Sequence, residues 1–413
     1  MGEIQDFPIF TPTESLAKTQ EILDPLKSET IVASSWPEAH NKLGLMHKKQ
    51  IQEILKESKD DDPKQFKKDL KFTKECEQFM RSHAKGLENT NPELTNAINT
   101  YLECVTEWSN GAGITPTEGL YLQNDGVGCQ SMFIRGQDGS IYFGHSEEMA
   151  DEGSVDLEVR PFSPNWITFE INGQKNHQAF SPYPELLPGV ASGMSDSRFF
   201  CADVLIPKES DSKPGFFANT ALWLTWYLGK SQPFENIVQQ LPNILGGYSL
   251  NILENSDSGP TLESVEFMNG IINIQELGRE PGSTIARRND ASGQELQAEQ
   301  DLGEDKGYFT ALKTAQERIL EAISTRLKRK NFNIPPKLDS IKKIFGFTGT
   351  PPERQQNEHT QVIMGIAKPC DIAVFAGELN PSGEFSTSLT LGPIVHKDKS
   401  IQELKLSGRD ILT

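Results

Sequence analysis

The chain has 413 residues, with 40 Lys and Arg against 58 Asp and Glu and a formal net charge of -18 at pH 7. This length allows one large domain or two to three ordinary ones, so a sizeable core can form without disulfides. The negative charge repels phosphate backbones and anionic membrane surfaces, which argues against nucleic acid or a membrane as a partner.

The start of the chain, MGEIQDFPIFTPTESLAK, has no basic segment followed by an apolar one, and no window approaches eighteen uncharged apolar residues. We therefore expect a soluble, cytoplasmic protein. The cysteines are odd in number and never spaced as CxxC, which favours buried thiols over disulfides or a zinc site. They are Cys76, Cys104, Cys129, Cys201 and Cys370.

Residues 14–108 are predicted to be helical. The clearest stripe is LTNAINTYLECVTEW, where apolar residues from Leu94 to Val105 recur at three- and four-residue steps. Beyond it, Thr115 to Glu118 form a capping box with Pro at the first helical position, which predicts a short helix to about Gln123.

After this helix the pattern changes to β. CQSMFIRG and SIYFGHSE are predicted strands joined at Asp138-Gly139, and their consecutive apolar residues are typical of a sheet covered on both faces. Further strands are predicted at 165–171, 198–206, 248–255, 262–269, 360–367 and 371–379. Helices are predicted at 218–228, 233–241 and 309–327, and a polar loop at 289–307.

The hairpin places a carboxylate opposite Cys129. With a two-residue turn at Asp138-Gly139, Cys129 lies directly opposite Glu148; with a three-residue loop it lies opposite Glu147. The Cβ atoms of such a pair are about 4.5–5.5 Å apart on the same face. A carboxylate alone raises the pKa of a thiol and makes it a poorer nucleophile. This pairing therefore indicates a nearby cation, either His145 or an α-amino group of Cys129 itself.

An α-amino group at Cys129 requires cleavage of the Gly128-Cys129 bond. It titrates near 7.7–8.0 and suits a general base that takes the thiol proton. The preceding glycines permit the strained backbone that thiol attack on the Gly128 carbonyl needs. The alternative from the residues alone is an ordinary core thiol at Cys129, with solvated glutamates beside it.

These residues resemble a known family. GCQSMFIRGQDGSIYFGHSEE is similar to the nucleophile hairpin of N-terminal nucleophile (Ntn) hydrolases of the choloylglycine hydrolase type. It is closer still to isopenicillin N acyltransferase and β-alanyl-dopamine hydrolase, with their GCTS-like and GHNED-like strands. LGLMHKKQIQEIL and NGAGITPTEGLYLQND also resemble the upstream family segments. The match covers residues 36–150 well, and the rest only by the order of elements.

The resemblance implies an α+β fold, the αββα sandwich of two antiparallel sheets, preceded by a helical segment. It divides the chain into a small chain, 1–128, and a catalytic core, 129–413, which stay associated after cleavage between Gly128 and Cys129. The implied chemistry is an acyl-enzyme on Cys129, formed from a small linear amide or acyl substrate that includes acyl-coenzyme A. The family needs no metal or redox cofactor, and a homo-oligomer is left open.

Carried over by position, Cys129 is the nucleophile, Glu148 orients its amine, and His145 stands where the bile-salt enzymes have Arg. The family's oxyanion Asn falls on Asp203, a departure because an ionised Asp cannot donate. Backbone amides, a protonated Asp203 or Asn289 would then serve. Lys313 and Arg318 are only approximate counterparts of a family Arg. The departures at Ser146 and Asp203 support the alternative of a catalytically silent Ntn-like protein that binds a ligand or partner.

A papain-like arrangement also fits part of the spacing. Gln123 precedes Cys129 as an oxyanion Gln would, and His359 lies downstream. Those enzymes place the Cys at a helix N-terminus, where the dipole lowers its pKa. Here the Cys begins a hairpin, which argues against this class.

Overall fold

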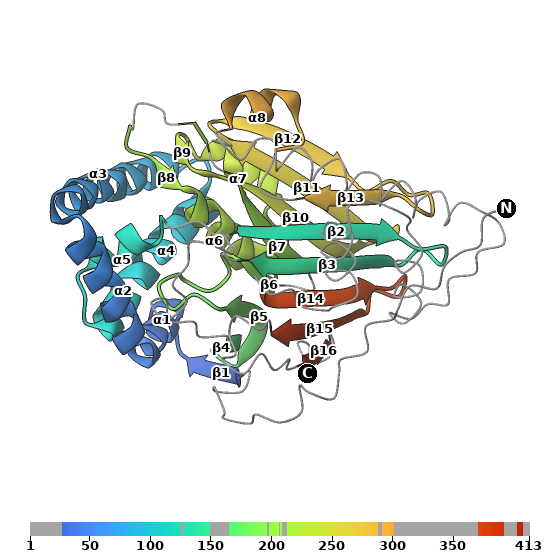
Figure 1. The fold of residues 1–413 in the computed structure, drawn as a ribbon, viewed down its shortest axis with the longest axis horizontal. Coiled ribbons are helices and arrows are strands. Elements are labelled where there is room, and N and C mark those ends of the chain that lie inside the picture. The colour runs from blue at the N-terminus through green and yellow to red at the C-terminus, as the bar shows by residue number, and fades with distance from the viewer. Residues whose placement is uncertain are drawn as a thin grey trace, which may run out of the picture.

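A computed structural model describes residues 27–124, 128–148, 165–195, 198–205, 207–208, 213–287, 291–300, 371–391 and 403–407. These residues form an α+β protein with two stacked sheets and a group of helices at one side (Figure 1). The described helices are α1 (Trp36–Met46), α2 (Lys48–Asp61), α3 (Pro63–Leu87), α4 (Pro92–Ala112), α5 (Pro116–Leu122), α6 (Ala218–Leu228), α7 (Phe234–Gln240) and α8 (Gln294–Glu299), with a 3-10 turn at Gly229–Ser231.

The larger sheet has eight strands and is antiparallel except at its first pair. Its order is β1 (Lys27–Ala33), β4 (Asn165–Ile171), β5 (Gln174–Ser181), β6 (Ser192–Ser195), β7 (Arg198–Leu205), β10 (Gly247–Ser256), β11 (Gly259–Met268) and β12 (Ile271–Glu276). A separate parallel pair joins β8 (Phe216–Phe217) to β9 (Ile244–Leu245).

The smaller sheet has six strands, all antiparallel. Its order is β13 (Thr284–Arg287), β2 (Gly128–Arg135), β3 (Ile141–Glu148), β14 (Asp371–Leu379), β15 (Phe385–Leu391) and β16 (Glu403–Ser407). Strand β2 contacts β7 of the larger sheet, and β3 contacts β11, so the two sheets lie face to face (Figure 1). An apolar cluster that includes Phe133, Phe143 and Phe199 fills the space between them.

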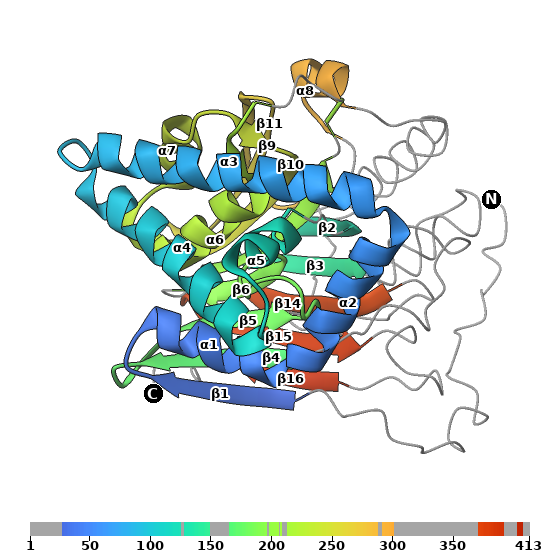
Figure 2. The same ribbon diagram turned by 90° about the vertical axis from the view of Figure 1, so that its left-hand side faces the viewer.

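Helices cover the other face of the larger sheet, and Figure 2 shows α1 to α5 as the layer in front of the strands. Helix α6 contacts both α4 and the strands β6 and β10, and every residue of α6 except Tyr227 is buried. Three layers, helices and two sheets, are therefore described. The helix predicted at 309–327, which would supply the fourth layer of an αββα sandwich, lies outside the described residues.

Two glycines allow α1 and α4 to pack closely. A Cβ atom added to Gly44 would lie 2.0 Å from the carbonyl oxygen of Trp108, and one added to Gly111 would lie 2.1 Å from that of Asn41. Any larger residue would push the helices apart. Of the sequence predictions here, the amphipathic stripe of α4 is confirmed, and so is the capping box of α5, where Thr115 and Glu118 bond reciprocally.

Three sequence predictions of secondary structure need correction. Residues 27–33 are not helical: their Thr-Ile-Val run forms β1, which pairs in parallel with β4, because β-branched residues fit a pleated sheet. Residues 294–299, predicted as loop, form the short helix α8, which packs on β11 and β12 through Leu296. The turn at Asp138-Gly139 is a three-residue loop, as shown below.

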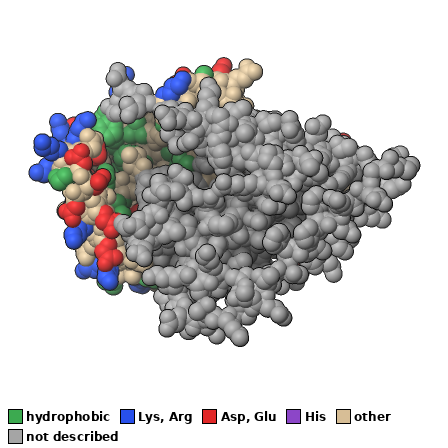
Figure 3. All heavy atoms as spheres, viewed as in Figure 1, with side chains coloured by type: hydrophobic (Ala, Val, Ile, Leu, Met, Phe, Trp, Pro, Cys, Tyr) green, Lys and Arg blue, Asp and Glu red, His purple; other side chains and the backbone are tan. Residues whose placement is uncertain are grey.

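Both charge signs are interspersed over the exposed helices, as Figure 3 shows at the side where α2 and α3 lie. Ion pairs four residues apart contribute, among them Lys49 with Glu53 and Arg81 with Glu77. Such exposed pairs stabilise a helix by only a few tenths of a kcal/mol. None of the described helices combines the length and the apolar character that a membrane span requires.

His40 on α1 is buried in an aromatic cluster with Trp36, Phe169 and Trp223. Its Nδ1 lies 2.8 Å from the carbonyl oxygen of Trp36, and its Nε2 has no hydrogen-bond partner within the described residues. Burial penalises the charged imidazolium and lowers the pKa of His40 from 6.5 to about 4.

We predict that His40 makes the protein acid-sensitive. The unfolded chain takes up a proton near pH 6.5 and the folded chain only near pH 4, so stability falls as the pH drops through this window. The loss attributable to His40 is on the order of 3 kcal/mol. Urea unfolding at pH 7 and pH 4 should show it in the wild type and not in His40→Phe, which keeps a ring there. An equal drop in both proteins would contradict the prediction.

Candidate active site

Cys129 lies at the start of β2, fully buried, and faces the larger sheet. The register pairs Cys129 with Glu147 and Gly128 with Glu148. The prediction that Glu148 lies opposite Cys129 is therefore wrong, and the three-residue-loop alternative, which places Glu147 there, is confirmed. The Glu148 side chain lies outside the described part of the structure.

The hairpin loop explains this register. The Gly136 amide donates to the Ser140 carbonyl, so Gln137, Asp138 and Gly139 form a three-residue loop. Gly139 has a φ of 86°, a left-handed conformation that glycine adopts without strain and that three-residue hairpins require. The Asp138 carboxylate accepts from the Ser140 amide at 3.0 Å and fixes the turn. The Asp-Gly pair thus favours a hairpin, but one residue longer than the two-residue turn.

Cys129 and His145 contact the same carboxylate. The thiol of Cys129 donates to Glu147 Oε2 at 3.0 Å, and Nε2 of His145 lies 2.9 Å from Glu147 Oε1. All three side chains are fully buried. His145, predicted as a cation near the thiol, therefore reaches Cys129 through Glu147.

A second set of hydrogen bonds continues from His145 to the larger sheet. Ser131 Oγ lies 2.9 Å from His145 Nδ1 and donates to Asp203 Oδ2 at 2.9 Å. Asn251 on β10 donates to the same Asp203 oxygen at 3.0 Å. A continuous chain of contacts thus runs from Cys129 through Glu147, His145 and Ser131 to Asp203.

The charges of this chain support one another. Burial lowers the pKa of His145, but the Cys201 sulfur and the Glu147 carboxylate outweigh burial and hold this pKa well above 6.5. Burial raises the pKa of Asp203 to about 6, against the opposing effects of His145 and Ser131. At neutral pH the arrangement is an imidazolium that donates from both ring nitrogens, between Glu147 and the Ser131–Asp203 pair.

Asp203, the predicted counterpart of an oxyanion Asn, is thus an acceptor of two hydrogen bonds at the far end of the chain of contacts from Cys129. The amide donor beside it is Asn251. Three buried oxygens near Asp203 and Cys201 have no hydrogen-bond partner among the described residues: Ser192 Oγ, Ser249 Oγ and Asn251 Oδ1. In the register, Ser192 lies opposite Cys201 and Ser249 opposite Asp203, so this part of the inter-sheet space has unused hydrogen-bonding capacity.

Gln123 has a structural role. Its amide group donates to the Glu185 carbonyl at 2.9 Å, and its Oε1 accepts from the Leu187 amide at 2.9 Å. Together with the position of Cys129 on a strand, this supports the sequence argument against a papain-like site. Of the other candidate residues, Asn289, Lys313, Arg318 and His359 lie outside the described residues.

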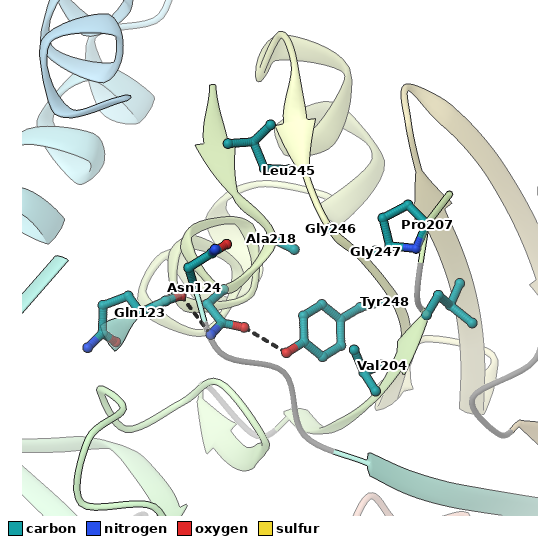
Figure 4. Close-up of a pocket in the computed structure, with 11 residues that line it drawn as sticks. Gln123, Asn124, Val204, Pro207, Ala218, Leu245, Gly246, Gly247 and Tyr248 are labelled. Carbon is teal, nitrogen blue, oxygen red and sulfur yellow. Dashed lines mark hydrogen bonds between the residues drawn. The ribbon is translucent and has the colours of Figure 1, made fainter. Parts of the chain in front are cut away.

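A pocket of about 180 Å³ lies at the end of α5, where Gln123 and Asn124 line it (Figure 4). Asn219 is one of the lining residues, and it donates to the Gln123 carbonyl at 2.8 Å and accepts from the Tyr248 hydroxyl at 2.8 Å. The remaining lining is mostly apolar: Val204, Leu205, Pro207, Ala218 and Leu245, with Asn124, Gly246 and Gly247. The pocket thus borders the chain four residues before Gly128.

Sequence reasoning missed Ser131 and Asn251. Both are buried polar residues on strands, and Ser131 lies two positions after Cys129, hence on the same face. Period-two alternation from Cys129 therefore identifies Ser131. Nothing in the spacing identifies Asn251, because its contact with Asp203 depends on the pairing of β7 with β10.

The same residues offer ligands for a cation. Cys129, His145 and Glu147 each present a ligand atom, and these atoms lie within 4.8 Å of one another. Thiolate, imidazole and carboxylate are the ligands that zinc uses in proteins.

Comparisons with known proteins identify no family. No protein-family model matches the chain, and no curated protein matches it either.

We predict that the Glu147 carboxylate keeps His145 protonated. In Glu147→Gln the isosteric amide removes a buried negative charge beside the imidazolium, so the pKa of His145 should fall. Titration of the histidine ring by NMR, assigned with His145→Gln, measures this shift. Glu148→Gln is the matched control and should change the titration less. Equal shifts in the two variants would show that Glu147 has no special contact with His145.

Proposed function

We propose that the protein is a self-processing Ntn-type cysteine hydrolase or acyltransferase with Cys129 as its nucleophile. The observation that carries the proposal is the buried contact of the Cys129 thiol with Glu147 at the first residues of a strand, between two stacked sheets. A thiol placed there has a base within hydrogen-bond distance, and a cation, His145, beside that base.

The proposed first reaction is cleavage before Cys129. Glu147 takes the thiol proton, and the sulfur attacks the Gly128 carbonyl carbon. The Gly128-Cys129 amide bond breaks as its nitrogen is protonated, which leaves a thioester to Gly128. Water then hydrolyses the thioester to give a Gly128 carboxylate, a free Cys129 thiol and a new α-amine.

In the proposed turnover, the α-amine takes the thiol proton and the thiolate attacks a small linear amide or acyl donor. The acyl group passes to Cys129 and then to water or an amine, which regenerates the thiol. An acyl-coenzyme A donor fits the same chemistry. The mostly apolar pocket beside Asn124 is a candidate for the apolar part of the substrate.

A catalytically silent binding protein is the second candidate. The full burial of Cys129 among residues of the helical core favours it, because a catalytic thiol must meet its substrate. This alternative predicts an intact chain.

The first test is the intact mass of the purified protein under denaturing conditions. We expect two fragments joined at Gly128/Cys129 in the wild type and one uncut chain in Cys129→Ala, because the thiol performs the cleavage. Circular dichroism of Cys129→Ala controls for folding. One full-length species in the wild type would overturn self-processing and favour the binding protein.

The second test asks which carboxylate acts on the thiol. General-base catalysis contributes roughly 10²–10⁴-fold, so Glu147→Gln should slow cleavage by about 100-fold or more. Glu148→Gln should cleave at close to the wild-type rate, since its register partner is Gly128 and not Cys129. Time courses of cleavage in newly synthesised chains, made by cell-free translation, measure both rates. The reverse order of rates would assign the role to Glu148 instead.

A further inference from the structure

We propose that Cys129, His145 and Glu147 form a binding site for one thiophilic divalent cation of the zinc class, and that this cation holds the nucleophile inactive. Binding depends only on the three side chains. The inhibitory consequence rests on the proposed function.

The ligand set and its spacing carry the inference. Glu147 already joins the other two groups, with Oε2 3.0 Å from the Cys129 sulfur and Oε1 2.9 Å from His145 Nε2. Tetrahedral zinc bonds of about 2.0–2.3 Å separate ligand atoms by roughly 3.5 Å. The three ligand atoms lie within 4.8 Å of one another, so shifts on the order of 1 Å would close them around an ion.

The surroundings of His145 are those of a metal-binding histidine. With Nε2 facing the site, Nδ1 lies 2.9 Å from Ser131 Oγ, and Ser131 donates to Asp203. Outer contacts of this kind orient a ligating imidazole and fix which nitrogen is left for the metal. Asn251 in turn holds Asp203. Ser131 therefore orients His145 as such outer contacts do, and it connects the imidazole to the Asp203 carboxylate.

The charges balance when the ion binds. Metal ligands bind in their deprotonated forms, so a divalent cation would meet a thiolate, a neutral imidazole and a carboxylate. The two negative charges of the thiolate and the Glu147 carboxylate equal the charge of the cation. Three protein ligands leave one position of the tetrahedron open.

Occupation would block both proposed reactions. Metal coordination engages the sulfur lone pair that must attack the Gly128 carbonyl, and it replaces the hydrogen bond through which Glu147 takes the thiol proton. The chain would then stay uncut, or its thiol unreactive, until the cation is removed.

The test uses Co²⁺ as a spectroscopic probe with the whole chelator-treated protein, whether cut or uncut, in the absence of oxygen. We expect one equivalent of Co²⁺ to give a thiolate-to-metal charge-transfer band, lost in Cys129→Ala and weakened at least tenfold in affinity in His145→Gln and Glu147→Gln. Cys201→Ala is the matched control: its buried sulfur lies 3.5 Å from Ser131 Oγ but is not one of the three ligands, so the band should remain.

Other outcomes decide against the site. A band that persists in Cys129→Ala would show that another thiol binds the ion, and no band in the wild type would overturn the proposal outright. Excess Zn²⁺ should raise the thermal midpoint of the wild type and not of Cys129→Ala, which separates lost ligation from a lost fold. The masses of the same samples report cleavage separately, so a failed metal site and a failed self-cleavage are told apart.

Discussion

The pairing of Cys129 with Glu147 across one hairpin is the contact on which the candidate site depends. It is set ten residues away, where Gly139 adopts a left-handed conformation and lengthens the loop by one residue. Since side chains alternate along a strand, a slip of one residue would turn Glu147 away from the thiol and bring Glu148 to its face. The backbone of the turn at the other end of the hairpin therefore determines which glutamate lies opposite Cys129.

The space between the two sheets changes character along the strands. Towards the hairpin loop, Phe133, Phe143 and Phe199 pack as an apolar core. Towards the start of β2, the inward positions become Cys129, Ser131, His145, Glu147 and Asp203. Burying an ionisable group lowers the stability of the fold unless the group has a partner. Removing one of these side chains would therefore destabilise the others. The apolar half stabilises the sandwich, and the polar half forms the candidate site.

Much of the fold was predictable because its signals are local. Periodicity, turn residues or capping chemistry predicts the following elements: the strands β2, β3, β4, β7, β10, β11 and β14, the helices α4, α6 and α7, and the capping box of α5. The strand β1 was missed because it is stabilised by a distant partner, β4, and lies among helices in the chain. Turn length, sheet order and the joining of Val265 and Phe267 to the helical core also depend on tertiary contacts.

The candidate site was predictable to a similar degree. Turn chemistry identifies Cys129, a facing glutamate and His145, and only the family resemblance points to Asp203. The choice between Glu147 and Glu148 requires the register. Ser131 was recoverable from alternation and Asn251 was not, because no pattern within one strand reveals a neighbour from another. The resemblance of the hairpin implies roles for these residues, and the observed contacts differ from those that it implies. His145 contacts Glu147, which contacts the thiol, and Asp203 accepts a hydrogen bond from Ser131.

The parallel pairing of β1 with β4 has a consequence for a chain cut before Cys129. The N-terminal piece would then supply an edge strand and helices α1 to α5 to a core completed by the other piece, including Trp223 and Trp226 of α6. Such a protein is thermodynamically a heterodimer, although it folded as one chain. Its unfolding would become dependent on concentration, and its two pieces would have to find each other to refold. Assembly would thus be strongly favoured only before cleavage, while the peptide bond still tethers the two halves. Because the cleavage site forms only in the folded chain, a cut chain would be one that had already folded.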